Sequence, residues 1–244
     1  MHETEIWLTK IFNDYIPSVG NVFLGLVGMP AQPRPWANFV TMQLLVVAIL
    51  LVLFAFLRTR LSVERPGKFQ QTFELVYEFV EGQTEDMVGH GGQRYMAFFG
   101  TLFLFILFSN LIGIIPGFEA PTMYAFVPTG CAIASFLYYN MAGIQAQGLL
   151  QHLKHFVGPV WWLFPLMIPI EIVSNLARPL SLTLRLFANM YAGEQITNVF
   201  ITLTKLIGPA VFMAFHIFVS FLQAYIFMLL TMVYVGGAVA HEEP

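Results

Sequence analysis

The sequence predicts an all-α polytopic membrane protein, and three observations support that prediction. The 244 residues are 57% hydrophobic and only 10% charged, whereas a soluble domain carries about 25% charged residues. The mean hydropathy is +0.71. Several segments exceed the roughly 20 apolar residues that an α-helix needs to cross a hydrocarbon core. We find no sequence repeat and no low-complexity linker, so residues 1–244 are treated as a single membrane domain.

The apolar segments predict about five transmembrane helices. Their expected ranges are 37–57, 95–115, 124–147, 161–203 and 208–239. The last two are long enough to form a tilted antiparallel hairpin, joined by a turn near Lys205. Residues 1–35 are rich in proline and glycine, and we expect an extracytoplasmic N-terminal segment there.

Residues 68–87 alternate apolar side chains with glutamates at a helical period, which predicts an amphipathic helix with one apolar stripe. We expect it to lie at the cytoplasmic interface of the membrane. The loop before it contains Arg58, Arg60 and Arg65, and the positive-inside rule places such a loop in the cytoplasm. The N-terminus is then outside and the C-terminus cytoplasmic.

The fourth predicted span carries charge at bilayer depth. Arg185 lies in its middle, where an arginine costs roughly 2.5–3.5 kcal/mol on insertion scales. Polar residues recur three or four positions apart along the same helix, on about one quadrant of its surface: Glu171, Ser174, Arg178, Ser181, Arg185 and Asn189. Polar side chains can simply hold helices together, but two arginines and a glutamate on one face favour a functional role.

A second polar stripe follows in the last predicted helix: His216, Ser220, Gln223, Thr231 and Tyr234. In an antiparallel hairpin with its turn near Lys205, Glu194 lies at the depth of His216 and Arg185 at the depth of Gln223. Glu194 and His216 are then a candidate proton-handling pair. Arg185 and Glu194 are nine residues apart, so on a straight helix they face nearly opposite surfaces.

Two stretches resemble a known family. Arg178-Pro-Leu-Ser-Leu-Thr-Leu-Arg-Leu-Phe-Ala-Asn-Met-Tyr-Ala-Gly-Glu194, followed by His216 and by Leu222-Gln-Ala-Tyr-Ile-Phe-Met-Leu-Leu-Thr231, is similar to the a subunit of F-type ATP synthases. Ser109-Asn-Leu-Ile-Gly-Ile-Ile-Pro-Gly117 resembles the same family. The similarity extends over nearly the whole chain from about residue 37, and residues 1–35 carry no diagnostic pattern.

The resemblance implies a rotary stator subunit. It implies that Arg185 faces a rotating ring of c subunits and meets each ring carboxylate in turn. It further implies two proton half-channels, which couple transmembrane proton flow to ring rotation and ATP synthesis. The residues that we expect along the proton pathway are Glu171, Arg178, Ser181, Asn189, Glu194, His216, Ser220 and Gln223.

The chain departs from the family pattern at two places. Ala188 stands where the family usually has glycine, and Pro121-Thr-Met-Tyr-Ala-Phe-Val-Pro128 lacks the Asn and Asp commonly found just after Pro-Thr. Glu119 is a candidate replacement for that missing polar residue.

The implied partners are the c-ring, the peripheral-stalk b subunits, the rest of the complex, membrane lipid and the translocated H⁺ or Na⁺. No Gly-x-x-x-x-Gly-Lys-Ser/Thr phosphate loop is present, so we expect no enzyme activity from this chain alone. We expect no cofactor, no nucleic acid and no metal, since His152 and His155 have no nearby acidic or Cys ligand. The expected location is the bacterial plasma (inner) membrane.

Two other functions fit parts of the pattern. A secondary transporter could bind an anionic substrate through Arg185 and Arg178, but such folds have internal repeats and broken helices in corresponding halves, and we find a polar hairpin only in the last third. A structural scaffold would leave the polar stripes unexplained. Co-purification separates the three, because a c-ring partner supports the rotary function and an autonomous oligomer supports the transporter.

Overall fold

The computed structural model describes residues 5–26, 28–62, 66–89, 91–115, 117–148, 164–203 and 207–239. Within these ranges the structure does not describe the following side chains: 26, 164–168, 171, 172, 198, 201–203 and 207–210. The turn at Lys205, the histidines His152 and His155, the C-terminal tail 241–244 and the Glu171 side chain therefore lie outside the described part.

The described residues form helices and short turns, and they contain no strand. In chain order the elements are α1 (Trp7–Tyr15), α2 (Pro17–Leu26), α3 (Asn38–Arg60), α4 (Lys68–Val88), η1 (Gly92–Tyr95), α5 (Met96–Leu111), η2 (Ile112–Ile114), η3 (Pro121–Met123), α6 (Phe126–Gln147), α8 (Phe164–Leu203) and α9 (Ile207–Val239). The longest are α8, with 40 residues, and α9, with 33. The prediction of an all-helical membrane fold is confirmed.

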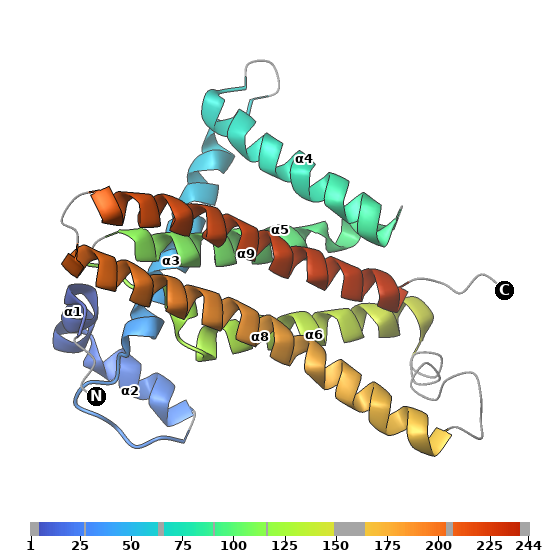
Figure 1. The fold of residues 1–244 in the computed structure, drawn as a ribbon, viewed down its shortest axis with the longest axis horizontal. Coiled ribbons are helices and arrows are strands. Elements are labelled where there is room, and N and C mark those ends of the chain that lie inside the picture. The colour runs from blue at the N-terminus through green and yellow to red at the C-terminus, as the bar shows by residue number, and fades with distance from the viewer. Residues whose placement is uncertain are drawn as a thin grey trace.

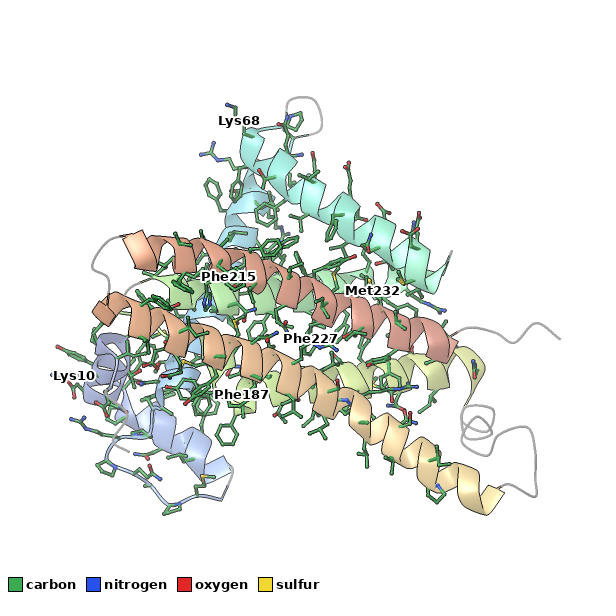
Figure 2. All side chains as sticks on the ribbon, in the orientation of Figure 1. Lys10, Lys68, Phe187, Phe215, Phe227 and Met232 are labelled. Atoms are coloured by element: carbon green, nitrogen blue, oxygen red, sulfur yellow. The ribbon has the colours of Figure 1, made fainter. Side chains whose placement is uncertain are left out.

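The long helices α8 and α9 run antiparallel and side by side, as predicted for the last two helices (Figure 1). Behind them α5 and α6 extend along the same direction, and α9 contacts α4, α5, α6 and α8 (Figure 1). Helix α9 is therefore the centre of the bundle. Lys10 in α1 lies at the left edge of the view and Lys68, at the start of α4, near its top (Figure 2).

The core is centred on α9, which packs against α5 and against α8. Its fully buried side chains are large and apolar: Phe99, Phe103 and Ile106 from α5, Leu186 and Met190 from α8, and Phe227, Met228, Met232 and Val235 from α9. Unbranched methionines fill irregular gaps between such helices. The opposite faces of α8 and α9 expose apolar side chains instead, including Leu180, Leu184, Phe215 and Phe218. Exposed apolar faces of this extent are typical of surfaces that meet lipid or a partner protein.

Helix α8 contains two prolines, Pro169 and Pro179. A proline inside a helix removes one backbone donor and crowds the preceding turn, which bends the helix. The chain of α8 changes direction part-way along its length (Figure 1). The bend predicted at Pro179 agrees with that course.

Helix α4 packs lengthwise on the bundle. Val80 and Thr84 are buried, and the Tyr225 hydroxyl of α9 donates a 2.8 Å hydrogen bond to Gln83 Oε1. Glu74, Glu78 and Glu85 are exposed. As the amphipathic pattern predicts, the apolar face of α4 packs on the bundle and the charged face points outward. At its C-terminal end α4 lies against Gly236, where an added Cβ would meet the Met87 carbonyl oxygen at 2.4 Å.

Three stretches of the described chain are long and apolar enough to cross a membrane: Asn38–Arg60, Gly92–Ile114 and Val211–Val239. Helix α8 is not among them, and it contains Glu171, Arg178, Arg185 and Glu194. The crossings by α6 and α8, and the orientation of the termini, stay predictions.

Candidate functional site

Arg185 lies on the outer face of α8. It is exposed, and its neighbours on that face are Leu184, which is 54% exposed, and Ala188. Among the described residues no carboxylate lies within 4.0 Å of this guanidinium. The chain therefore presents a permanent cation on an apolar surface without a carboxylate of its own to neutralise it.

Arg178 has different surroundings, although it lies only two turns before Arg185 on α8. Its guanidinium carbon is 5.8 Å from the ring centroid of Tyr139 in α6 and 5.1 Å from that of Tyr234 in α9. Aromatic ring faces attract a cation at such distances. The Tyr139 hydroxyl also donates a 2.5 Å hydrogen bond to Asn175 Oδ1. Arg178 is thus turned into the bundle between α6 and α9, where Arg185 is turned out.

Asn189 and Gln223 join the two polar stripes. Asn189 Nδ2 donates a 2.8 Å hydrogen bond to Gln223 Oε1 across the α8–α9 hairpin. The depth argument paired Gln223 with Arg185, one turn earlier. The observed partner of Gln223 is Asn189, one turn later on the same face of α8.

A cavity of about 400 Å³ lies between α8 and α9, and Asn189 and Gln223 both line it. The polar residues around it are Asn189, Thr197, His216 and Gln223. His216 is 8% exposed and packs on Gly193, since a Cβ added to that glycine would lie 3.2 Å from its Nδ1. No described residue hydrogen-bonds to His216 Nε2. A buried, unpaired imidazole nitrogen beside a cavity can exchange a proton with water that enters it.

Glu194 faces the loop between α5 and α6. Its carboxylate lies near the backbone of Ala120 and within electrostatic range of Glu119. The Oε2 atom of Glu194 is buried and has no hydrogen-bond partner among the described residues. Glu194 and His216 lie at neighbouring depths, as predicted, but no hydrogen bond joins them.

A buried polar cluster connects α5, η3 and α9 near the same end of the hairpin. The Thr122 hydroxyl donates a 2.6 Å hydrogen bond to Asn110 Oδ1, and Asn110 Nδ2 donates a 3.4 Å bond to the Ser220 carbonyl. The hydroxyl oxygens of Ser109 and Ser220 are buried, and within the described part of the chain they have no partner.

Comparisons with known proteins agree with the motifs. Residues 40–236 match the family described as ATP synthase A chain. The chain belongs to this family. It is 68% identical to the ATP synthase subunit a of Solibacter usitatus, over 95% of this chain and 100% of that one. It is 44% identical to the subunit a of Koribacter versatilis, over 97% and 98% of the two chains, and 44% identical to subunit a 2 of Syntrophotalea carbinolica, over 90% and 93%.

In this member of the ATP synthase A chain family, the predicted site residues fall into three groups. Asn189, His216 and Gln223 surround one cavity, Arg178 lies among tyrosines, and Arg185 and Ser181 lie on the exposed face. Glu194 joins none of them directly and faces the η3 loop.

The motif reasoning did not select Asn110 or Thr122. Each is a single polar residue in or beside an apolar segment, without periodicity. The signal available in the sequence was an amide side chain in a phenylalanine-rich apolar segment, where a polar group requires a hydrogen-bond partner.

Proposed function

We propose that this chain is the stator subunit of a rotary ATP synthase, which forms two proton half-channels against a ring of c subunits. It couples transmembrane proton flow to ring rotation and to ATP synthesis on other subunits. The observation that carries the proposal is the exposed position of Arg185 on the apolar face of α8, with no carboxylate within 4.0 Å in the described chain. Family membership supports it independently.

Arg185 explains coupling through its fixed charge. A cation at membrane depth is expensive unless a counter-charge approaches it. A carboxylate on a passing ring subunit supplies that counter-charge, and the guanidinium favours the ionised form of the carboxyl group, so the proton is released there. Because arginine does not give up its own proton, Arg185 cannot relay protons itself and blocks direct leakage between the two half-channels.

The outer half-channel is assigned to the cavity between α8 and α9, together with Glu194 and Ser220. Its polar lining of Asn189, His216 and Gln223 supports this assignment, since proton relays need groups that donate and accept hydrogen bonds along a hydrated path. The second half-channel is assigned to the segment of α8 that contains Glu171, Arg178 and Ser181. The polar contacts around Arg178 support that assignment.

The energy comes from the membrane potential. Each charge that crosses a potential of about 100 mV releases about 2.3 kcal/mol. Several such steps are needed for the synthesis of one ATP, which fits a multi-subunit ring as the partner.

The other proposed partners are the peripheral-stalk b subunits, the rest of the complex and membrane lipid. The N-terminus is placed outside the bacterial inner membrane and the C-terminus in the cytoplasm. The translocated ion is H⁺ or Na⁺.

The alternative of an anion transporter requires Arg185 and Arg178 to converge on one ligand. Arg185 is on the exposed face of α8, whereas Arg178 lies between the rings of Tyr139 and Tyr234. The different surroundings of the two arginines weigh against a shared substrate site.

The test is Arg185→Ala in the intact complex, reconstituted into proteoliposomes. We expect assembly to be retained and gradient-driven ATP synthesis to be abolished, because the charge that ionises the ring carboxylate is gone. Arg58→Ala is the matched control, since Arg58 is also an exposed arginine but lies in the last turn of α3. Normal synthesis by Arg185→Ala would refute the proposed function.

A further inference from the structure

A second cavity, of about 520 Å³, lies between α3, α4 and α5. Its lining residues come from α3 and the residue after it, from α4, and from η1 and α5. It is therefore separate from the cavity of the α8–α9 hairpin. Sites for small molecules in proteins typically have volumes of about 300–1,000 Å³, so this cavity is large enough to hold a ligand.

The walls of this cavity are mostly apolar. Phe54 of α3 and Phe73 of α4 face each other across one side, with 5.9 Å between their ring centroids. Val80 and Leu104 line the cavity and are buried, whereas Phe54 and Tyr77 line it and are exposed. The cavity thus extends from the outer surface of the chain toward the core. Its occupant is expected to be apolar along most of its length.

The shape of the cavity favours a narrow ligand. Helices α3, α4 and α5 cross one another and form three sides of a triangle (Figure 1). The C-terminal end of α4 is fixed on α9, where a Cβ added at Gly236 would meet the Met87 carbonyl oxygen. A partner helix binds along an open groove, and these crossing helices do not form one. A single hydrocarbon chain fits the enclosed space better.

The cavity has a polar corner where the end of α3 approaches the start of α4. Gln70 is buried there and exchanges two hydrogen bonds with the Ser62 backbone, at 2.9 and 3.1 Å. Gln70 Nε2 also donates a 2.7 Å hydrogen bond to Glu74 Oε1. Glu74 lines the cavity and is exposed, and no Lys, Arg or His of the described ranges lies within 4.0 Å of its carboxylate. This corner therefore offers a negative charge to a ligand.

Two exposed basic residues flank the same corner. The Arg60 guanidinium carbon lies 5.5 Å from the Phe56 ring centroid, and Phe56 packs on Phe69 at 5.5 Å between centroids. Phe69 in turn packs at 5.1 Å on Phe73, which lines the cavity. Lys68 begins α4 (Figure 2). Basic residues beside the end of a membrane helix attract the phosphate groups of lipids.

We propose that this cavity binds one acyl chain of a membrane phospholipid, whose phosphate lies toward Arg60 and Lys68. Glu74 makes the site selective for a headgroup with an ammonium group. A purely anionic headgroup satisfies the basic residues but faces the Glu74 carboxylate with like charge, whereas a zwitterionic aminophospholipid matches both signs. The inference does not depend on the proposed rotary function.

The experiment uses the intact complex in vesicles that contain phosphatidylethanolamine with a photoreactive diazirine in its acyl chain. After irradiation, adducts on this chain are mapped by mass spectrometry and normalised to the amount of assembled complex. We expect adducts on the buried wall around Val80 and Leu104. Absence of adducts from the cavity would overturn the proposal, because the space would then be covered by protein or left without lipid.

Gly100 allows the cavity to be filled. It lines the cavity, and nothing lies within 4 Å of a Cβ added there. We expect Gly100→Leu to lower the labelling of the cavity about fivefold or more, since crowding a filled site is costly. Gly130→Leu is the matched control, because Gly130 also has open space around its Cβ position but lies in α6. Unchanged labelling in Gly100→Leu would overturn the proposal.

A second filling variant covers the case in which Gly100→Leu does not assemble. Ala97 is an exposed lining residue one turn earlier on α5. Ala97→Leu is expected to lower the labelling in the same way, and unchanged labelling in this variant would equally overturn the proposal.

The selectivity of the headgroup has its own readout. Phosphatidylglycerol with the same photoreactive chain is expected to label the wild-type cavity about two- to fivefold less than phosphatidylethanolamine, the range that an exposed ion pair supports. Glu74→Gln is expected to remove this difference, and Glu78→Gln, at an exposed glutamate that does not line the cavity, is expected to keep it. Arg60→Gln is expected to lower labelling by both lipids. Equal labelling of the wild type by the two lipids would overturn the role of Glu74.

Discussion

Gly113 controls how closely the loop that carries Glu119 and Ala120 approaches the bundle. A Cβ added at Gly113 would lie 2.7 Å from the Ala120 Cβ, 2.9 Å from its nitrogen and 3.1 Å from its Cα. Ordinary contacts between carbon atoms are about 3.5–4.0 Å. To reach the lower limit of an ordinary contact, the Gly113→Ala variant has to move Ala120 away by about 0.8 Å.

Such a shift moves the loop relative to Glu194, which lies near Ala120 and within electrostatic range of Glu119. Overpacking of this kind costs about 1–3 kcal/mol. About 1.4 kcal/mol in the barrier of the proton-transfer step corresponds to about tenfold in rate.

The assay is gradient-driven ATP synthesis per assembled complex. We expect Gly113→Ala to lower the rate about tenfold, and the amount of assembled complex to fall as well, because overpacking costs about 1–3 kcal/mol. Gly130→Ala is the control, since nothing lies within 4 Å of a Cβ added there. Ala120→Gly in the same chain removes the nearest clashing atom and is expected to restore part of the rate. If Gly113→Ala and Gly130→Ala both match the wild type, the loop does not hold Glu194 in the way described.

Two further predictions concern packing and the hairpin. Gly236→Ala is expected to lower the midpoint temperature at which this chain dissociates from the solubilised complex, because its Cβ would meet the Met87 carbonyl oxygen at 2.4 Å. Gly237→Ala is the adjacent control, since nothing lies within 4 Å of a Cβ added there. Equal midpoint temperatures in the two variants would contradict the α4–α9 contact. A double-mutant cycle on Asn189→Leu and Gln223→Leu is expected to give a coupling of about 0.6 kcal/mol, and at most about 1.7, as for other hydrogen bonds between membrane helices. A coupling of zero in the same dissociation assay would mean that the 2.8 Å bond contributes nothing.

The sequence predicted the helices well because apolar length and helical period are local properties. The amphipathic helix expected over 68–87 is α4, Lys68–Val88, and the last two long helices form the antiparallel pair. The depth argument also placed His216 beside Glu194 along the hairpin, since His216 packs on Gly193.

The direction in which each side chain points could not be predicted in the same way. Arg178 and Arg185 are seven residues apart and share one side of a straight helix, yet Arg178 lies near the rings of Tyr139 and Tyr234 while Arg185 is exposed. The difference arises from where α6 and α9 end along α8 and from the bend at Pro179, which spacing alone does not contain. The loop that Glu194 faces lies more than seventy residues earlier in the chain, and no local pattern links the two.

The central position of α9 has a mechanical consequence. A helix clamped by α4, α5, α6 and α8 has little freedom to slide or rotate, and α8, which carries Arg185, rests against it. A sideways load applied at that guanidinium would therefore be spread through the whole bundle rather than absorbed by local bending. Under the proposed rotary function, the elastic compliance of the complex would then lie in the ring or in the peripheral stalk rather than in this chain.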